Sequence, residues 1–78
     1  MKLIVKVFDW TEGDKANRFL RAMFKKKLKV WDAGVDSDTY VLVAAHKKPT
    51  RKKLIGYYGL EGENPDTWPQ VKELLDED

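Results

Sequence analysis

The chain has 78 residues, of which 42% are hydrophobic and 36% are charged, and it contains no cysteine. This length predicts one domain spanning residues 1–78, and the aromatic and β-branched content predicts a folded chain rather than a disordered one. The lack of cysteine excludes disulfides, thiolate metal sites and cysteine nucleophiles in this chain.

Charge is distributed unevenly along the sequence. The formal net charge is only +2, but residues 1–59 carry fourteen Lys or Arg against six Asp or Glu, whereas residues 60–78 carry one against seven. A basic body attracts polyanions and an acidic tail repels them, so the two parts would act differently on a charged partner. Matching of the two charges within the molecule is the alternative explanation.

Neither a signal peptide nor a membrane span is predicted. Residues 1–10 begin with a lysine and apolar residues, but Lys6 and Asp9 interrupt the apolar run and no small-residue cleavage site follows. No segment approaches the roughly 20 apolar residues that a membrane-spanning helix needs. We therefore expect a cytoplasmic protein that does not bind membranes.

The first two predicted elements are a strand and a helix. Residues 2–10 alternate in a way typical of a strand, and we expect Leu3, Val5 and Val7 to face the helices. Residues 12–26 place apolar side chains at spacings of three and four, which predicts a helix with one apolar stripe. The side chain of Thr11 is expected to cap its start.

Three consecutive lysines, Lys25, Lys26 and Lys27, end the predicted helix. Cations in the last turn of a helix are stabilised by the helix dipole, by about 0.3–1 kcal/mol each. This structural role is the preferred interpretation of the three lysines, and phosphate binding is the alternative.

Three further strands and a second helix are predicted. Residues 28–32 form a short strand, and residues 35–38 form a polar turn. Residues 39–46 are apolar on both faces, which indicates a central strand, and residues 52–58 return beside it to complete a hairpin. From Thr67 onward, a capping box and an apolar stripe predict a second helix with a frayed acidic end.

The predicted fold is therefore α+β, with the element order β-α-β-β-β-α. Such an order predicts a two-layer sandwich, in which a four-stranded mixed sheet carries both helices on one face and the crossover is right-handed. The opposite face of the sheet is expected to be open to a ligand.

Catalysis is weakly supported by the sequence. Ser37 and His46 bound the same predicted strand, which places them about 30 Å apart at 3.3 Å per residue and excludes a serine triad. His46, next to lysines, is better interpreted as a solvated residue than as a general base. Asp32, Asp36 and Asp38 lack the spacing of a calcium loop, so we expect an ordinary polar turn. We therefore expect a protein that is not an enzyme and uses no cofactor or metal.

A binding surface is the more informative candidate. Aromatic rings flanked by lysines on an open sheet are typical of proteins that bind single-stranded nucleic acid, because every base has a π-face that can stack. A basic hairpin turn adds phosphate contacts and a salt-dependent affinity. The candidate residues are Lys6, Trp31 and Tyr57 on the sheet and Lys47, Lys48, Arg51, Lys52 and Lys53 in and after the turn.

The same residues support a second hypothesis. Exposed aromatic and aliphatic side chains on a sheet face also form protein–protein and homodimer interfaces, in which Tyr and Trp are enriched. The chain would then be an interaction module or a small protein inhibitor that uses the same face. As a third alternative, some of these rings belong to the core. The sequence leaves the choice between nucleic acid and protein open.

Overall fold

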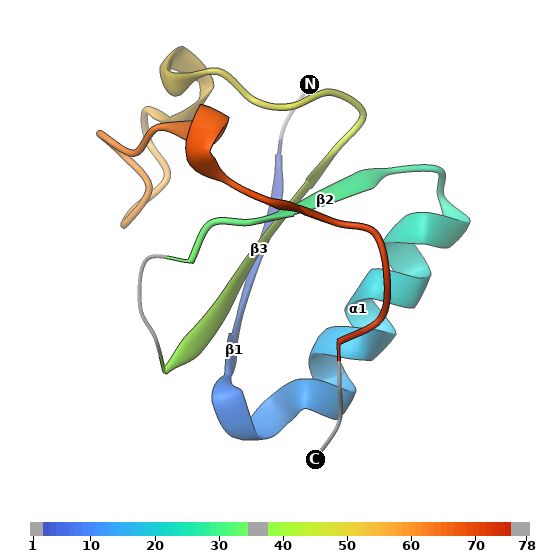
Figure 1. Cartoon of the computed structure of the whole chain (residues 1–78). Helices are drawn as coiled ribbons and strands as arrows, with labels where there is room; N and C mark the ends of the chain where they lie inside the picture. The colour runs from blue at the N-terminus through green and yellow to red at the C-terminus, as the bar shows by residue number, and fades with distance from the viewer. Residues whose placement is uncertain (1–2, 35–37, 76–78) are drawn as a thin grey trace.

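The computed structural model describes residues 3–34 and 38–75. The predicted start of the first strand at residue 2, the turn at 35–37 with Asp36 and Ser37, and the frayed end at 76–78 lie outside the described residues. The elements in chain order are β1 (Ile4–Asp9), the 3-10 helix η1 (Trp10–Glu12), α1 (Gly13–Lys25), β2 (Lys29–Asp32), β3 (Thr39–Ala45), the 3-10 helices η2 (Arg51–Leu54) and η3 (Pro65–Thr67), and β4 (Gln70–Val71) (Figure 1).

The strands that the structure describes form one sheet in the order β1-β3-β2-β4. All three strand pairs are antiparallel, so the sheet is not mixed as predicted. β1 pairs with one edge of β3, from Ile4 opposite Ala44 to Asp9 opposite Thr39, and β2 pairs with the other edge. The α+β class and the four-stranded sheet are confirmed.

The predicted strand at 52–58 is wrong, because these residues form the end of η2 and a series of turns. β1 and β2 already occupy both edges of β3, so no hydrogen-bonding edge remains for a returning strand. The Tyr57 amide instead donates to the Leu54 carbonyl at 3.0 Å, and the Leu60 amide donates to the Tyr57 carbonyl at 2.9 Å. Gly56 and Gly59 have φ of +93° and +86°, which glycine adopts readily.

Both faces of the sheet are covered, so neither is the open face that the sequence predicted. One face packs against Ala16, Leu20 and Met23 of α1. The other face packs against the irregular segment 46–69, mainly through Leu54 and Trp68. Figure 1 shows this segment and α1 on different sides of the strands.

The two faces of β1 are the reverse of the prediction. Ile4 and Phe8 pack on the α1 side, where the Phe8 and Phe19 ring centroids are 5.9 Å apart. Leu3 and Val5 pack on the side of segment 46–69. The predicted alternation is present, but both faces of this strand carry apolar residues, so the pattern alone does not show which face meets the helix.

The second predicted helix is also wrong, because the described residues after η3 form β4 and irregular chain rather than a helix. Gln70 lies opposite Trp31 and Val71 lies opposite Val30. Trp68 packs in the core on one face of the sheet, and Val71 packs in the core on the other face. Residues three apart on a helix share one face, so a helix could not bury both side chains in this way.

The Thr11 side chain does not cap α1 as predicted: the capping box belongs to η1, and Glu12, the N-cap residue of α1, makes no side-chain capping hydrogen bond to that helix. Asp9 caps η1 by accepting from the Thr11 amide at 3.1 Å, and Glu12 Oε1 accepts from the Asp9 amide at 2.9 Å. Two interactions hold the pKa of Glu12 below its ordinary value. The larger effect comes from the hydrogen bond with the Asp9 amide, and the second comes from the Lys15 ammonium, which lies 3.0 Å from Glu12 Oε2. Glu12 therefore stabilises the cap above the ordinary glutamate pKa, and this contribution is lost as the pH falls.

The end of α1 contains a strained residue. The Lys27 amide donates to the Phe24 carbonyl and the Leu28 amide donates to the Met23 carbonyl, both at 3.0 Å, which is the pattern of a Schellman motif. This motif places Lys27 in the left-handed region, with φ of +66°. Glycine is usual at this position, because a residue with a Cβ atom pays about 1–2 kcal/mol there.

Asn17 ties the C-terminal segment to α1. The side chain is 2% exposed; its Nδ2 donates to the Leu75 carbonyl at 2.8 Å and its Oδ1 accepts from the Leu75 amide at 2.6 Å. Leu75 also packs with Val71 against the apolar cluster of α1. The amide side chain thus pairs with the extended backbone as a neighbouring strand would.

We predict that Asn17→Ala lowers the free energy of unfolding by about 1–3 kcal/mol, because both backbone groups of Leu75 lose a partner. Hydrogen exchange of the Leu75 amide should accelerate more than exchange of the Val30 amide in the sheet. Arg21→Ala, at an exposed position of the same helix, is the control. Equal exchange of the Leu75 amide in the two variants would contradict this role.

Candidate functional site

Five cations of the predicted site lie together in one loop. We call residues 46–53 the basic loop; its exposed cations are Lys47, Lys48, Arg51, Lys52 and Lys53. Pro49 within the loop and Leu54 directly after it are buried, so the segment that carries Arg51, Lys52 and Lys53 is anchored at both ends. Among the described residues, none of the five cations forms an ion pair, whereas Lys15 and Arg18 of α1 both do. The charge of the loop is therefore available to a partner.

One hollow lies between the basic loop and the end of the sheet. Its volume is about 270 Å³, and we call it the basic hollow. Leu3 and Ala45 contribute apolar surface, and Lys47, Lys48 and Lys53 contribute cations; no acidic residue within 3–34 and 38–75 lines it. Small-molecule pockets usually measure about 300–1,000 Å³, so this hollow fits one part of a larger ligand.

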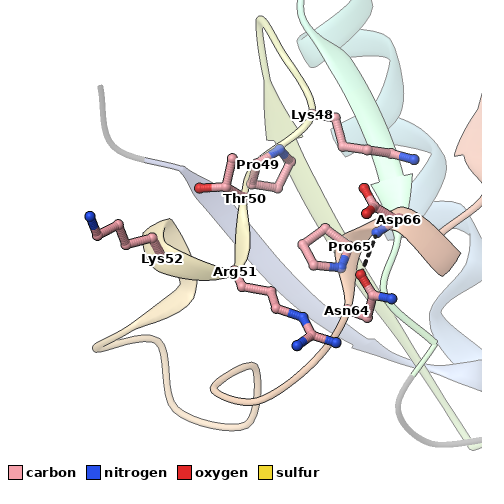
Figure 2. Close-up of a pocket in the computed structure, with 8 residues that line it drawn as sticks. All are labelled: Lys48, Pro49, Thr50, Arg51, Lys52, Asn64, Pro65 and Asp66. Carbon is pink, nitrogen blue, oxygen red and sulfur yellow. Dashed lines mark hydrogen bonds between the residues drawn. The ribbon is translucent and has the colours of Figure 1, made fainter.

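A second hollow, of about 420 Å³, lies between the basic loop and η3. Figure 2 shows Lys48 and Asp66 along one part of its wall and Lys52 directed away from it. Asn64 shapes the η3 side by accepting a hydrogen bond from the Asp66 amide at 3.2 Å. Because the Asp66 carboxylate repels anions, the basic hollow is the better place for a phosphate.

Two aromatic residues of the predicted site are not available for stacking. Trp31 is 3% exposed and packs in the core against Val43 and Leu54. Tyr57 is partly buried against the same core, and its hydroxyl accepts a hydrogen bond from the Leu3 amide at 3.1 Å. The interpretation of these rings as an open stacking surface is wrong, because segment 46–69 covers this face of the sheet.

Lys6 is exposed but lies on a different face from the one predicted. It is opposite Leu42 in the sheet, and Leu42 belongs to the apolar cluster that packs against α1. Opposing residues of an antiparallel pair point to the same side, so Lys6 projects on the α1 side. Trp31 points to the other side, and the structure therefore does not bring Lys6 and Trp31 together.

Sequence reasoning missed one exposed residue that follows the basic loop. Tyr58 is fully exposed, and Ile55, which alternation placed on the same strand face as Tyr57, is 71% exposed. Strand alternation favoured Tyr57 over Tyr58, but residues 55–60 are turns, so alternation does not apply to them. The glycines at 56 and 59 were the signal that this pair of tyrosines belongs to turns rather than to a strand.

Other kinds of site find no support among the residues that the structure describes. No group of three or more His, Cys, Asp or Glu side chains is placed to hold a metal ion. Asp32 instead accepts a hydrogen bond from the Gly34 amide at 2.9 Å, as in a polar turn. No helix in these ranges is long and apolar enough to cross a membrane.

Comparisons with protein-family models, with curated proteins and with solved structures found no match for this chain. Fold alone does not determine function, so function is inferred below from the charge, exposure and contacts of the residues described above.

We predict that Trp31→Ala lowers the free energy of unfolding by about 3–5 kcal/mol, as expected for removal of a buried aromatic side chain. Tyr58→Ala should change it by no more than about 0.5 kcal/mol, because the side chain is exposed and no hydrogen bond of its hydroxyl is described. Urea unfolding followed by circular dichroism measures both. A Trp31→Ala protein as stable as Tyr58→Ala would show that Trp31 is not part of the core.

Proposed function

We propose that this chain is a non-enzymatic domain that binds single-stranded nucleic acid through the basic loop. The observation that carries the proposal is the set of five exposed loop cations, which form no ion pairs among the described residues. Three of them, Lys47, Lys48 and Lys53, line the basic hollow, where no described acidic residue lies. Tyr58 takes the stacking role that Trp31 and Tyr57 lack, because it is exposed and follows the loop closely in the sequence.

Two physical terms contribute to this binding. Each phosphate contact releases a counterion, so log K falls with log salt by about 0.7 per contact for a single strand. Stacking of one base on an aromatic ring contributes about 1–3 kcal/mol and requires an unpaired base. The basic loop supplies the first term and Tyr58 the second. We therefore expect a single strand to bind more tightly than a duplex of the same length.

The test is fluorescence anisotropy with a labelled 20-nucleotide oligo-dT at several salt concentrations. We predict that replacing Arg51, Lys52 and Lys53 by Gln lowers the slope of log K against log salt by about 2, since three phosphate contacts are lost. Tyr58→Ala should weaken binding by about 5-fold or more at each salt concentration, because stacking is not electrostatic.

The matched control replaces Lys15, Arg18 and Arg21 of α1 by Gln. It makes the same change in net charge on exposed residues of the opposite layer, so its salt slope should stay close to that of the original protein. Equal losses in the loop variant and the control would mean that only net charge matters and would contradict a site at the basic loop.

A protein partner is the second candidate. Within the described residues, the outer edge of β1 pairs with no other strand, while Val7 and Trp10 beside it are 62% and 64% exposed. An extended segment can join such an edge through main-chain hydrogen bonds and bury these side chains. The partner would be a strand of another protein or of a second copy of this chain.

This second candidate predicts a concentration-dependent mass above 9.1 kDa for a homodimer, and a loss of that association in Val7→Lys. The lysine places a charge against the added strand and should leave the exposed edge otherwise unchanged. Analytical ultracentrifugation measures the association. A monomer at all concentrations would rule out the homodimer.

A further inference from the structure

One of the two strands next to β3, which contributes Ala45 to the basic hollow, is β2, and the proposed site does not include it. Lys29, the first residue of β2, lies opposite Ala45, which lines the hollow. Opposing residues in an antiparallel pair project from the same side of the sheet, so Lys29 is on the side of the hollow. Lys29 is exposed and makes no ion pair with a described residue. The cationic surface therefore continues beyond the basic loop.

The turn before β2 adds further cations at the same end of the sheet. Lys26 and Lys27 are exposed, and Figure 1 shows their turn at the end where β2 begins and β3 leads into the basic loop. The backbone bonds from Lys27 and Leu28 back into α1 fix the turn. Lys26 and Lys27 therefore lie in a turn whose backbone is held by hydrogen bonds to α1.

Lys27 is an unfavourable choice for its backbone conformation. Its φ of +66° is one that glycine adopts without strain, and lysine does not. The helix dipole explains a cation in the last turn of α1, but it does not explain why a side chain is present at this left-handed position. Strained backbone conformations of this kind cluster at functional sites.

We propose that Lys27 and Lys29 extend the nucleic-acid site, so that one strand runs from the basic loop across the basic hollow to the turn after α1. This inference rests on the proposed function and adds the path and length of the ligand. Lys29 contacts the phosphate nearest the hollow, and Lys27 contacts a phosphate farther along the strand. The strain at Lys27 is retained for this contact.

The test uses Lys27→Gly, which has opposite effects on folding and on binding. Glycine relieves the left-handed strain, so the melting temperature should rise by a few degrees. Loss of one phosphate contact should lower the salt slope for the labelled 20-nucleotide oligo-dT by about 0.7 and weaken binding at low salt. Lys29→Gln should give the same loss of slope.

Two controls distinguish the loss of a phosphate contact at Lys27 from a general loss of positive charge. Lys27→Arg keeps the cation and should retain the original affinity, and Arg21→Gln removes one exposed cation of α1 and should retain the slope. If Lys27→Gly and Lys29→Gln bind as Arg21→Gln does, the extended site is overturned. A Lys27→Arg protein as weak as Lys27→Gly would overturn it too, because the charge would then not be the cause.

The two proposals fail in different ways. If the original protein does not bind the oligonucleotide at low salt, both fail. If the original protein binds and the variant of Arg51, Lys52 and Lys53 is weakened, but Lys27→Gly and Lys29→Gln are not, the proposed function stands and the extended site fails. A shorter oligonucleotide, of four nucleotides, should lose sensitivity to Lys27→Gly while it keeps sensitivity to the loop variant.

Discussion

The pairing of β3 on both edges is the constraint on which the rest of the structure depends. β1 and β2 occupy these edges in antiparallel register, and the side chains of Val43 and Leu42 are buried on opposite faces. The chain that leaves β3 at Ala45 therefore cannot add a strand beside it. It crosses one face of the sheet instead, anchored by Leu54 and Trp68, and its charged residues remain at the surface.

The sequence predicted the elements whose periodicity is strong and missed those that depend on remote partners. The stripe of Ala16, Leu20 and Met23 was enough to predict α1, and apolar residues on both faces identified β3 as central. The segment 46–69 has no regular period, because turns separate its buried side chains Leu54 and Trp68. Nothing local in the sequence showed that it would cover a sheet face.

In the candidate site too, some residues could be predicted from the sequence and others could not: the exposed cations were predicted, and the exposed aromatic residue was not. Charged side chains are rarely buried without a partner, so the exposure of the five loop cations followed from residue type whatever the fold. Aromatic side chains are as common in cores as in binding surfaces, and their location had to be inferred from strand alternation. Alternation failed at Trp31 because the covering layer was unknown, and at Tyr57 and Tyr58 because their segment is not a strand.

The hydrogen bonds between Asn17 and Leu75 bear on where the charges of the sequence lie in the fold. These hydrogen bonds bring the last described residues along α1 toward its start, whereas the basic loop lies at the other end of the sheet (Figure 1). The described acidic residues of the tail are divided by this arrangement: Glu73 lies in the segment that leads to Asn17, whereas Asp66 lines the second hollow with Lys48 and Arg51. No described acidic residue lines the basic hollow, so internal neutralisation acts at the second hollow first. This distribution favours approach of a polyanion with the basic hollow and the turn at Lys27 facing it, because the field of the protein orients a charged ligand before contact.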